Sequence, residues 1–433
     1  MDAVREPSSE QARRVALSLV LMFFGMLLSH KIVGRLAFSN IAQLASLVTL
    51  FSAFPHVLRP RDVGWILLSC GAVIAAALSV YSAYGYEAQP QHAVFFLAAG
   101  IYLVAWYRAT RTYRLVDITE SAVRWTILPI LAYVSIHTAV DLAAGDVYTD
   151  MGFDDKSHAA VAIGVYAFVA LRLWRNAVKL PIAGAFMLLS LLTASRLPLL
   201  MVPFFVLAFI VEYRHTRRLA DSVWKVYVCH VTVIVGAIGT LVTLVNNWDS
   251  FHVFSRVGEN ANSSSQSSTE AHLLLIQFGI QIKFDNVLNV LLGVTPGGFA
   301  GTVYRSGIDI SEIPSGGGGA SIAAGTAPMH STHTSIFAEF PLPIFVLYAV
   351  LLVWLLVRLV RRRDNVLALG LMGFVAATMF YSSHNEVYFY AILALFIAEA
   401  SGPAPEADVG PVRGTRIPRR ALRGISTPRA LAV

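Results

Sequence analysis

Residues 341–357, "PLPIFVLYAVLLVWLLV", run for seventeen positions without a charged side chain. An α-helix that crosses the hydrocarbon core of a bilayer needs roughly 20 mostly apolar residues, so this stretch and its flanks suit a membrane span. The whole chain of 433 residues is 56% hydrophobic and 14% charged, whereas soluble domains are about 45–50% apolar and about 25% charged. The composition therefore predicts a protein that is integral to a membrane.

Apolar stretches of this kind recur along the chain and predict an all-α, polytopic membrane protein with twelve transmembrane helices. The joins near 30–36, 195–197 and 383–386 are short enough to be tight hairpins. The predicted spans are 15–30, 36–54, 64–83, 92–107, 125–140, 159–174, 179–195, 197–213, 225–245, 335–357, 366–383 and 386–400.

Basic residues set the expected orientation of these spans. If the N-terminus is cytoplasmic, the joins on the cytoplasmic side and the two termini carry 26 of the 33 lysines and arginines. Three of the other seven, Arg256, Lys283 and Arg305, lie in a loop too long for the positive-inside rule, which leaves 26 against four. We therefore predict that both termini are cytoplasmic. The net charge of +7 reflects this sidedness and does not indicate a nucleic-acid partner.

The sequence predicts one membrane domain without an internal repeat. The tail is rich in Pro, Gly and Arg, so we expect it to be disordered and to rest on anionic lipid. The predicted segments are a cytoplasmic N-terminus (1–14), spans 1–9 (15–245), a large outer loop (246–334), spans 10–12 (335–400) and a basic cytoplasmic tail (401–433).

The middle of the outer loop, 273–293, fits two kinds of secondary structure. Residues 276–284 alternate as a β-strand would, but a helix would carry an apolar stripe on one face. Because the stripe continues past the alternating part, we predict a helix that lies at the outer surface. The glycine run 316–319 is predicted to hold no regular element and to act as a mobile flap. The stripe consists of Ile280, Phe284, Val287, Leu288 and Leu291.

Arginine is the informative residue on the outer side. Arg196 lies in "LLTASRLPLL", at the outer turn between two spans, where a charge at the edge of the hydrocarbon costs up to about 2.5–3.5 kcal/mol. One interpretation is an arginine that reaches a lipid phosphate. The other is a guanidinium held for an anionic ligand, since arginine pairs bidentately with phosphate and stays protonated. Arg256 and Arg305 are weaker candidates for the same role.

Protonatable side chains gather in "MHSTHTSIFAEF", residues 329–340, at the junction of the outer loop and a span. His330 and His333 would share a helical face if the span extends upward by a turn, and Glu339 follows within the top of the span. Imidazole accepts a proton near neutral pH, which suits a general base. Two histidines and a carboxylate can also bind zinc, but helical zinc ligands are typically spaced i, i+4 in HExxH.

Three stretches, taken in order, resemble signatures of the O-antigen ligase and O-antigen polymerase superfamily of bacterial membrane glycosyltransferases. "LLTASRLPLL" resembles the Ser-Arg signature at the start of a span. "NVLLGVTPGGF" resembles the loop signature G-x-G-P-G-N-F through Gly293, Pro296 and Gly297. "MHSTHTSIFAEFPLP" resembles H-N-x-x-L-x-x-x-x-E-x-G. The likeness covers roughly residues 160–400.

The chain also departs from this pattern. Thr295 replaces the second loop glycine, and Gly298 stands where Asn is usual. In the third signature Ser331, Thr334 and Pro341 replace Asn, Leu and Gly. Family members often carry an arginine shortly before the loop signature, where "STEAHLLL" offers Glu270 and His272 instead; His272 or Arg256 is the candidate to compensate.

The resemblance implies a GT-C-like, metal-independent inverting glycosyltransferase in the bacterial inner membrane. It would transfer a glycan from an undecaprenyl-diphosphate carrier to a sugar hydroxyl at the periplasmic face, without a nucleotide sugar or another cofactor. His330 or His333 would be the base, Glu339 would orient it, and Arg196 would hold the diphosphate. The acceptor is a second lipid-linked glycan for a polymerase or lipid A-core for a ligase. Membrane lipids and a chain-length regulator are further expected partners.

Two other classes of function remain open from the sequence. A transporter or flippase of lipid-linked glycans or solutes commonly has twelve spans, but charges within the spans are scarce here and an outer loop of this length is unusual for a carrier. An inert scaffold is the third class. Within the transferase class, the departures from the family signatures favour a substrate-specific polymerase of a surface polysaccharide.

Overall fold

The computed structural model describes residues 5–25, 31–33, 36–86, 90–144, 149–153, 155–173, 178–193, 195–218, 264–311, 313, 318–382 and 387–401. These residues form α-helices joined by short segments, with one pair of short antiparallel strands. The all-α prediction is therefore confirmed. The described residues lie in one compact unit, Met1–Gly402. Nearly all of the predicted disordered tail lies outside them.

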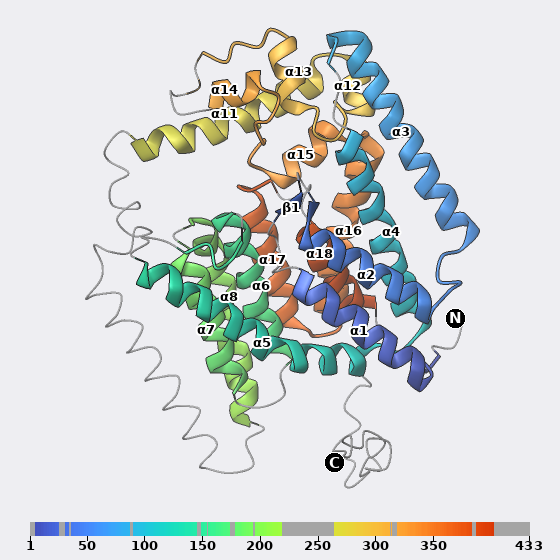
Figure 1. Ribbon diagram of the computed structural model, residues 1–433, viewed down its shortest axis with the longest axis vertical. Coiled ribbons are helices and arrows are strands. Elements are labelled where there is room, and N and C mark those ends of the chain that lie inside the picture. The colour runs from blue at the N-terminus through green and yellow to red at the C-terminus, as the bar shows by residue number, and fades with distance from the viewer. Residues whose placement is uncertain are drawn as a thin grey trace, which may run out of the picture. The chain divides into compact units, whose positions relative to one another are not determined.

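The N-terminal half consists of two short strands and eight of the helices that the structure describes (Figure 1). Strands β1 and β2 pair where the sequence predicts a tight hairpin between the first two helices. The elements are α1 (Ser9–Gly25), β1 (Lys31–Val33), β2 (Leu36–Ala37), α2 (Phe38–Ala53), α3 (Pro60–Tyr84), α4 (Pro90–Thr112), α5 (Val116–Ala143), α6 (Lys156–Leu173), α7 (Lys179–Leu192) and α8 (Leu197–Arg218).

The C-terminal half begins with helices that belong to the predicted outer loop and ends with three apolar helices, of which α16 is the longest (Figure 1). The elements are α11 (Ser264–Phe284), α12 (Val287–Leu292), α13 (Phe299–Arg305), α14 (Gly318–Ala323), α15 (Thr332–Glu339), α16 (Leu342–Arg361), α17 (Asn365–Thr378) and α18 (Val387–Ser401).

Local signals in the sequence set the ends of these helices, as α3 illustrates. Proline lacks a backbone N–H and has a fixed φ, so Pro60 suits the first turn. The Asp62 carboxylate accepts the Arg59 backbone N–H at 2.9 Å and caps that turn. At the other end Gly85 has a φ of +62°, the left-handed conformation that glycine adopts without steric cost.

Five of the described helices are long and apolar enough to cross a membrane. Four shorter apolar helices accompany them, and the predicted span 225–245 lies outside the described residues. These helices are compatible with a multi-pass membrane protein. The five candidate spans are Pro60–Tyr84, Ile118–Ala143, Lys156–Leu173, Leu197–Thr216 and Leu342–Arg361.

The predicted span 335–357 is wrong at its start. Helix α15 ends at Glu339, Phe340 is extended, and α16 begins at Leu342 after Pro341. A proline has no backbone N–H to donate and disfavours a helical conformation in the residue before it, so the chain breaks here. The candidate span is therefore α16, and α15 is a separate short helix that precedes it.

Helix α6 lies at the centre of the unit, and its side chains are buried along almost its whole length. It packs against α7, α8 and α17. Helices α3 and α16, in contrast, expose apolar side chains such as Leu78 and Leu347. An apolar outer surface on long helices suits contact with lipid rather than with water.

Ion pairs join helix ends that carry the basic residues of the predicted cytoplasmic side. Arg108 near the end of α4 binds the Asp62 carboxylate near the start of α3, with Nε–Oδ2 2.9 Å and Nη2–Oδ1 2.5 Å. Arg172 at the end of α6 binds Asp364 before α17, with Nε–Oδ2 2.6 Å. Each ion pair therefore connects two joins between helices that the orientation prediction places on the cytoplasmic side of the membrane.

The middle of the outer loop is helical, so the prediction of a helix rather than a strand is confirmed. It consists of α11 and α12, and Asp285 and Asn286 separate the two helices. The Tyr84 hydroxyl at the end of α3 donates to Asp285 Oδ2 at 2.6 Å. It also accepts the side-chain amides of Asn286 and Asn289, each at 2.8 Å. These bonds attach the outer helices to the end of a candidate span.

The predicted flap is partly wrong. Helix α14 begins at Gly318, so the second half of the glycine run 316–319 does hold a regular element. Residues 316–317 lie outside the described residues. Helix α14 packs against α13, and the neighbouring Gly325 lies against the Tyr86 ring. Such packing supplies contacts that an isolated glycine-rich segment lacks.

Candidate functional site

Three polar side chains from distant parts of the sequence are linked, two by ring stacking and the third by its charge. The rings of His272, on α11, and His330, just before α15, stack with centroids 3.9 Å apart and planes inclined by 17°. Arg196, the residue before α8, acts electrostatically on His272. His272 therefore stacks on one residue that the sequence singles out, His330, and lies within electrostatic reach of another, Arg196. We call these three residues the Arg–His cluster.

Local backbone geometry places His330 outside the helix that follows it. His330 has a φ of +54°, and Ser331 caps α15 by accepting the Thr334 N–H. His330 therefore lies outside the helix, and the expectation that His330 and His333 share a helical face is wrong. The serine that replaces the family's asparagine in the third signature is a good N-cap residue, which explains where α15 begins.

Burial keeps the cluster's imidazoles neutral. It lowers the pKa of His330 to about 4, and the neighbouring His272 lowers it as well. Burial, followed by the positive charge of Arg196, lowers the pKa of His272. Among the described residues, the His330 ring nitrogens make no hydrogen bond. Near neutral pH, His330 can therefore accept a proton.

His333 has a different environment from His330. Tyr348 on α16 donates its hydroxyl to Nδ1 at 2.9 Å, and Nε2 donates to the Val375 carbonyl on α17 at 3.1 Å. The Thr378 hydroxyl lies 3.3 Å from the same Nε2. Both ring nitrogens are therefore engaged, and His333 ties α15 to α16 and α17. This arrangement suits a structural histidine better than a base.

Glu339 holds the loop signature in place. Its Oε2 accepts the Gly297 N–H at 3.0 Å, and the Val294 N–H donates to the Ala338 carbonyl at 3.0 Å. A Cβ at Gly293 would lie 2.6 Å from the Glu339 carbonyl, so the close approach requires glycine. The contacts of Glu339 with the loop add a structural role to the expected one of orienting a histidine.

The loop signature has a backbone that explains its glycines. Gly293, Thr295 and Gly297 have φ values of +77°, +66° and +72°. These are the three positions at which the family signature carries glycine, and left-handed φ favours that residue. Pro296 between them is buried. A Cβ at Gly298 would lie 1.9 Å from the Val294 carbonyl, which explains why Gly stands at this position.

The other candidate residues lie elsewhere. Arg305 is exposed at the end of α13, and Arg256 lies outside the described residues. A buried lysine that the sequence analysis did not select, Lys283, donates from Nζ to the Phe340 carbonyl at 3.0 Å and supports the α15–α16 break. Burial lowers the pKa of Lys283 to about 8. In the described ranges, no group of three His, Cys, Asp or Glu side chains is arranged to hold a metal ion.

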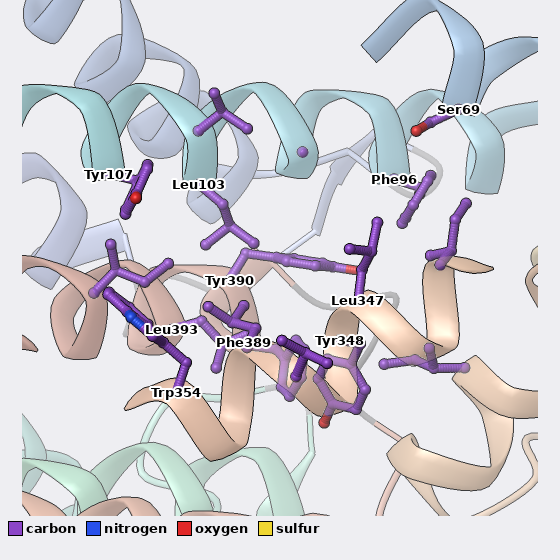
Figure 2. A pocket seen from close by; sticks show the side chains of 17 residues that line it. Ser69, Phe96, Leu103, Tyr107, Leu347, Tyr348, Trp354, Phe389, Tyr390 and Leu393 are labelled. Atoms are coloured by element: carbon purple, nitrogen blue, oxygen red, sulfur yellow. The ribbon is translucent and has the colours of Figure 1, made fainter. Parts of the chain in front are cut away.

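An apolar cleft of about 500 Å³ opens beside α15. Leu103 and Tyr107 of α4 face Trp354 of α16 and Tyr390 of α18 across it (Figure 2). Ile336, one turn from both His333 and Glu339, lines the cleft. The Glu339 carboxylate also acts electrostatically on the Tyr390 hydroxyl. The helix that carries the third signature, α15, therefore contributes to the lining of the cleft.

Neither the comparison with protein families nor the comparison with curated proteins finds a match for this chain. The stacking of His272 on His330 is the feature that sequence reasoning missed. The sequence does contain a signal for it, because His272 stands where the resembled signatures carry arginine. Only the fold shows that His272 contacts His330.

Proposed function

We propose that the chain is a metal-independent inverting glycosyltransferase of the O-antigen ligase and polymerase type. It would transfer a glycan from an undecaprenyl-diphosphate carrier to a sugar hydroxyl at the outer face of the bacterial inner membrane. The observation that carries the proposal is the stacked His272–His330 pair within electrostatic reach of Arg196. A fixed cation and a neutral imidazole at one place are what this reaction needs.

In the proposed reaction, the acceptor hydroxyl attacks the anomeric carbon of the donor sugar in line with the leaving diphosphate. His330 takes the hydroxyl proton as the new C–O bond forms. The bond from the anomeric carbon to the diphosphate oxygen breaks, and its electron pair leaves with the carrier. Arg196 stabilises the negative charge that grows on this oxygen. His272 stacks on His330 and feels the charge of Arg196.

The apolar cleft suits the tail of such a carrier. Its lining is almost wholly aliphatic and aromatic, and it lies among helices α3, α4, α16 and α18. A polyprenyl chain that enters there would emerge near α15, which follows His330 in the chain. The left-handed φ values at all three glycine positions of the loop signature further support the family resemblance.

The proposal includes a finer topology. The twelve predicted spans would place both termini in the cytoplasm and the Arg–His cluster on the periplasmic side. The polymerase function is favoured over the ligase function by the departures at Ser331 and Pro341. Deleting the gene in its host distinguishes the two functions: loss of a polymerase leaves a single repeat on the acceptor, and loss of a ligase leaves bare core.

Reconstitution tests the proposal. The purified protein in liposomes should join carrier-linked oligosaccharides, and mass spectrometry should detect a new glycosidic linkage and released undecaprenyl diphosphate. The Arg196→Ala variant, purified in the same way, is the negative control. Translocation of the carrier-linked donor across the vesicle membrane without any chain transfer would contradict the proposal and favour a flippase.

A further inference from the structure

The outer helices carry a row of large apolar side chains that face away from the protein. Ile280 and Phe284 on α11, and Val287, Leu288 and Leu291 on α12, are between 44% and 73% exposed. We call these five residues the outer stripe. Single exposed apolar residues are common, but a contiguous row of them marks a surface that binds another apolar surface.

The opposite faces of the same helices are fixed, so the outer stripe cannot turn inward. On α11, Phe278 and Ile282 are buried, and the buried Lys283 donates to the Phe340 carbonyl. On α12, the buried Asn289 donates to the Tyr84 hydroxyl and to the Ile282 carbonyl, each at 2.8 Å. The packing therefore presents the stripe outward.

The outer stripe continues into the apolar faces of two candidate spans. Phe284 contacts Phe337 with ring centroids 5.8 Å apart, and Phe337 contacts Phe345 of α16 at 5.1 Å. Helix α12 packs against both α3 and α16. Nearby on α16, Leu347 is 64% exposed. The acidic Asp285 between α11 and α12 accepts the Tyr84 hydroxyl, so its charge is held toward α3.

We propose that the outer stripe is a lipid-docking surface, which inserts into the boundary between headgroups and acyl chains of the outer leaflet. Continuity with the membrane-facing sides of α3 and α16 identifies lipid as the occupant, because the same apolar phase covers those helices. Helix α12 leads directly into the loop that begins at Gly293. Docking would therefore hold this loop at headgroup level, whether or not the chain transfers glycans.

Spin labelling tests this placement in the full chain. The label is attached at Val287→Cys in a Cys70→Ser, Cys229→Ser background, in vesicles of phosphatidylethanolamine and phosphatidylglycerol. Leu347→Cys on α16 serves as the lipid-exposed reference, and Asp309→Cys, in an exposed turn, serves as the aqueous reference. The label at 287 should collide with oxygen several-fold more often, relative to a water-soluble nickel complex, than the label at 309.

Two outcomes would overturn the proposal. Equal accessibility to the nickel complex at positions 287 and 309 would place the outer stripe in water. Protection from both reagents, with dipolar broadening between labels, would show that a second copy of the chain covers it. A label at Leu291→Cys repeats the measurement on the next turn of α12. The placement of the outer stripe can therefore be tested even if the Val287→Cys variant folds poorly.

Discussion

Arg196 and His330 are far apart in the sequence, and the fold brings His272 to both, to His330 by stacking and to Arg196 by charge. Because a guanidinium stays protonated, Arg196 is the fixed positive charge of the Arg–His cluster. Replacing Arg196 with alanine should lower the rate of glycan transfer by about 10²–10³-fold, the usual loss when one donor to a growing anion is removed. Membrane insertion and yield should be unchanged.

A second arginine provides the comparison for this prediction. Arg305 is exposed at the end of α13, so Arg305→Ala should keep a transfer rate close to that of the unmodified protein. Both variants are assayed with carrier-linked donor in liposomes. Equal rates for Arg196→Ala and the unmodified protein would remove Arg196 from the site.

The pH dependence of kcat/KM tests the state of His330. A base works in its neutral form, and burial lowers the pKa of His330 to about 4. As the pH falls, kcat/KM should therefore stay level through pH 6 and decline only as His330 is protonated near pH 4. A decline centred near pH 6.5, the ordinary value for an exposed histidine, would contradict the assignment.

His272 allows a check on the direction of this effect. His272 lowers the pKa of His330, so His272→Ala should move the acid limb of kcat/KM to higher pH. A purely structural role for His272 would reduce the yield of folded protein without shifting this limb.

At the scale of elements, the loop signature depends on a close approach between its backbone and the end of α15. Gly293→Ala adds a Cβ that would lie 2.6 Å from the Glu339 carbonyl, at a φ of +77°. Gly307 has a similar φ of +76° but no atom within 4 Å of the added Cβ. Both substitutions cost about 1–2 kcal/mol for the left-handed backbone, and only Gly293→Ala adds a steric clash.

Thermal unfolding of the two glycine variants in detergent measures this difference. Gly293→Ala should lower Tm clearly more than Gly307→Ala does. Equal shifts in Tm would mean that the loop does not pack against Glu339 as described.

The junction of α3 with the outer helices provides another matched pair. The Tyr84 hydroxyl makes three hydrogen bonds to Asp285, Asn286 and Asn289, and Tyr81, one turn earlier, is exposed. Tyr84→Phe should lower the free energy of unfolding by about 1–3 kcal/mol because it removes all three of these hydrogen bonds. Tyr81→Phe should have little effect, and a comparable loss in both variants would argue against this junction.

Parts of this fold could be predicted from the sequence because they depend on local patterns. The apolar stripe from Ile280 to Leu291 correctly favoured a helix over a strand, since its period continued past the alternating segment. Pro341 is the local signal for the break after α15, but the apolar residues on both sides of it continue the pattern of a span. The order of the three signatures singles out Arg196, Gly293 and His330 without any knowledge of contacts.

The remaining features depend on tertiary contacts that no local pattern shows. Two histidines three positions apart are equivalent in the sequence. The fold makes their environments different, because Tyr348 and Val375 from two other helices form hydrogen bonds with the two ring nitrogens of His333. The stacking of His272 on His330 likewise requires α11 to pack against α15. No local pattern in the sequence predicts that packing.

At the scale of the whole molecule, an apolar cleft, a lipid-facing stripe and the Arg–His cluster would together form one path for a lipid-borne sugar. The cleft lies among helices α3, α4, α16 and α18, and the stripe lies on the outer helices. On this account a carrier would reach the cluster from within the bilayer. The transfer step itself then depends on His330.

The most direct test compares the rate of glycan transfer by purified, reconstituted His330→Ala with that of His215→Ala. His215 is an exposed histidine near the far end of α8 from Arg196. His330→Ala should be slower than the unmodified protein by about 10²-fold or more, while His215→Ala keeps the full rate. A full rate of transfer by His330→Ala would contradict the account.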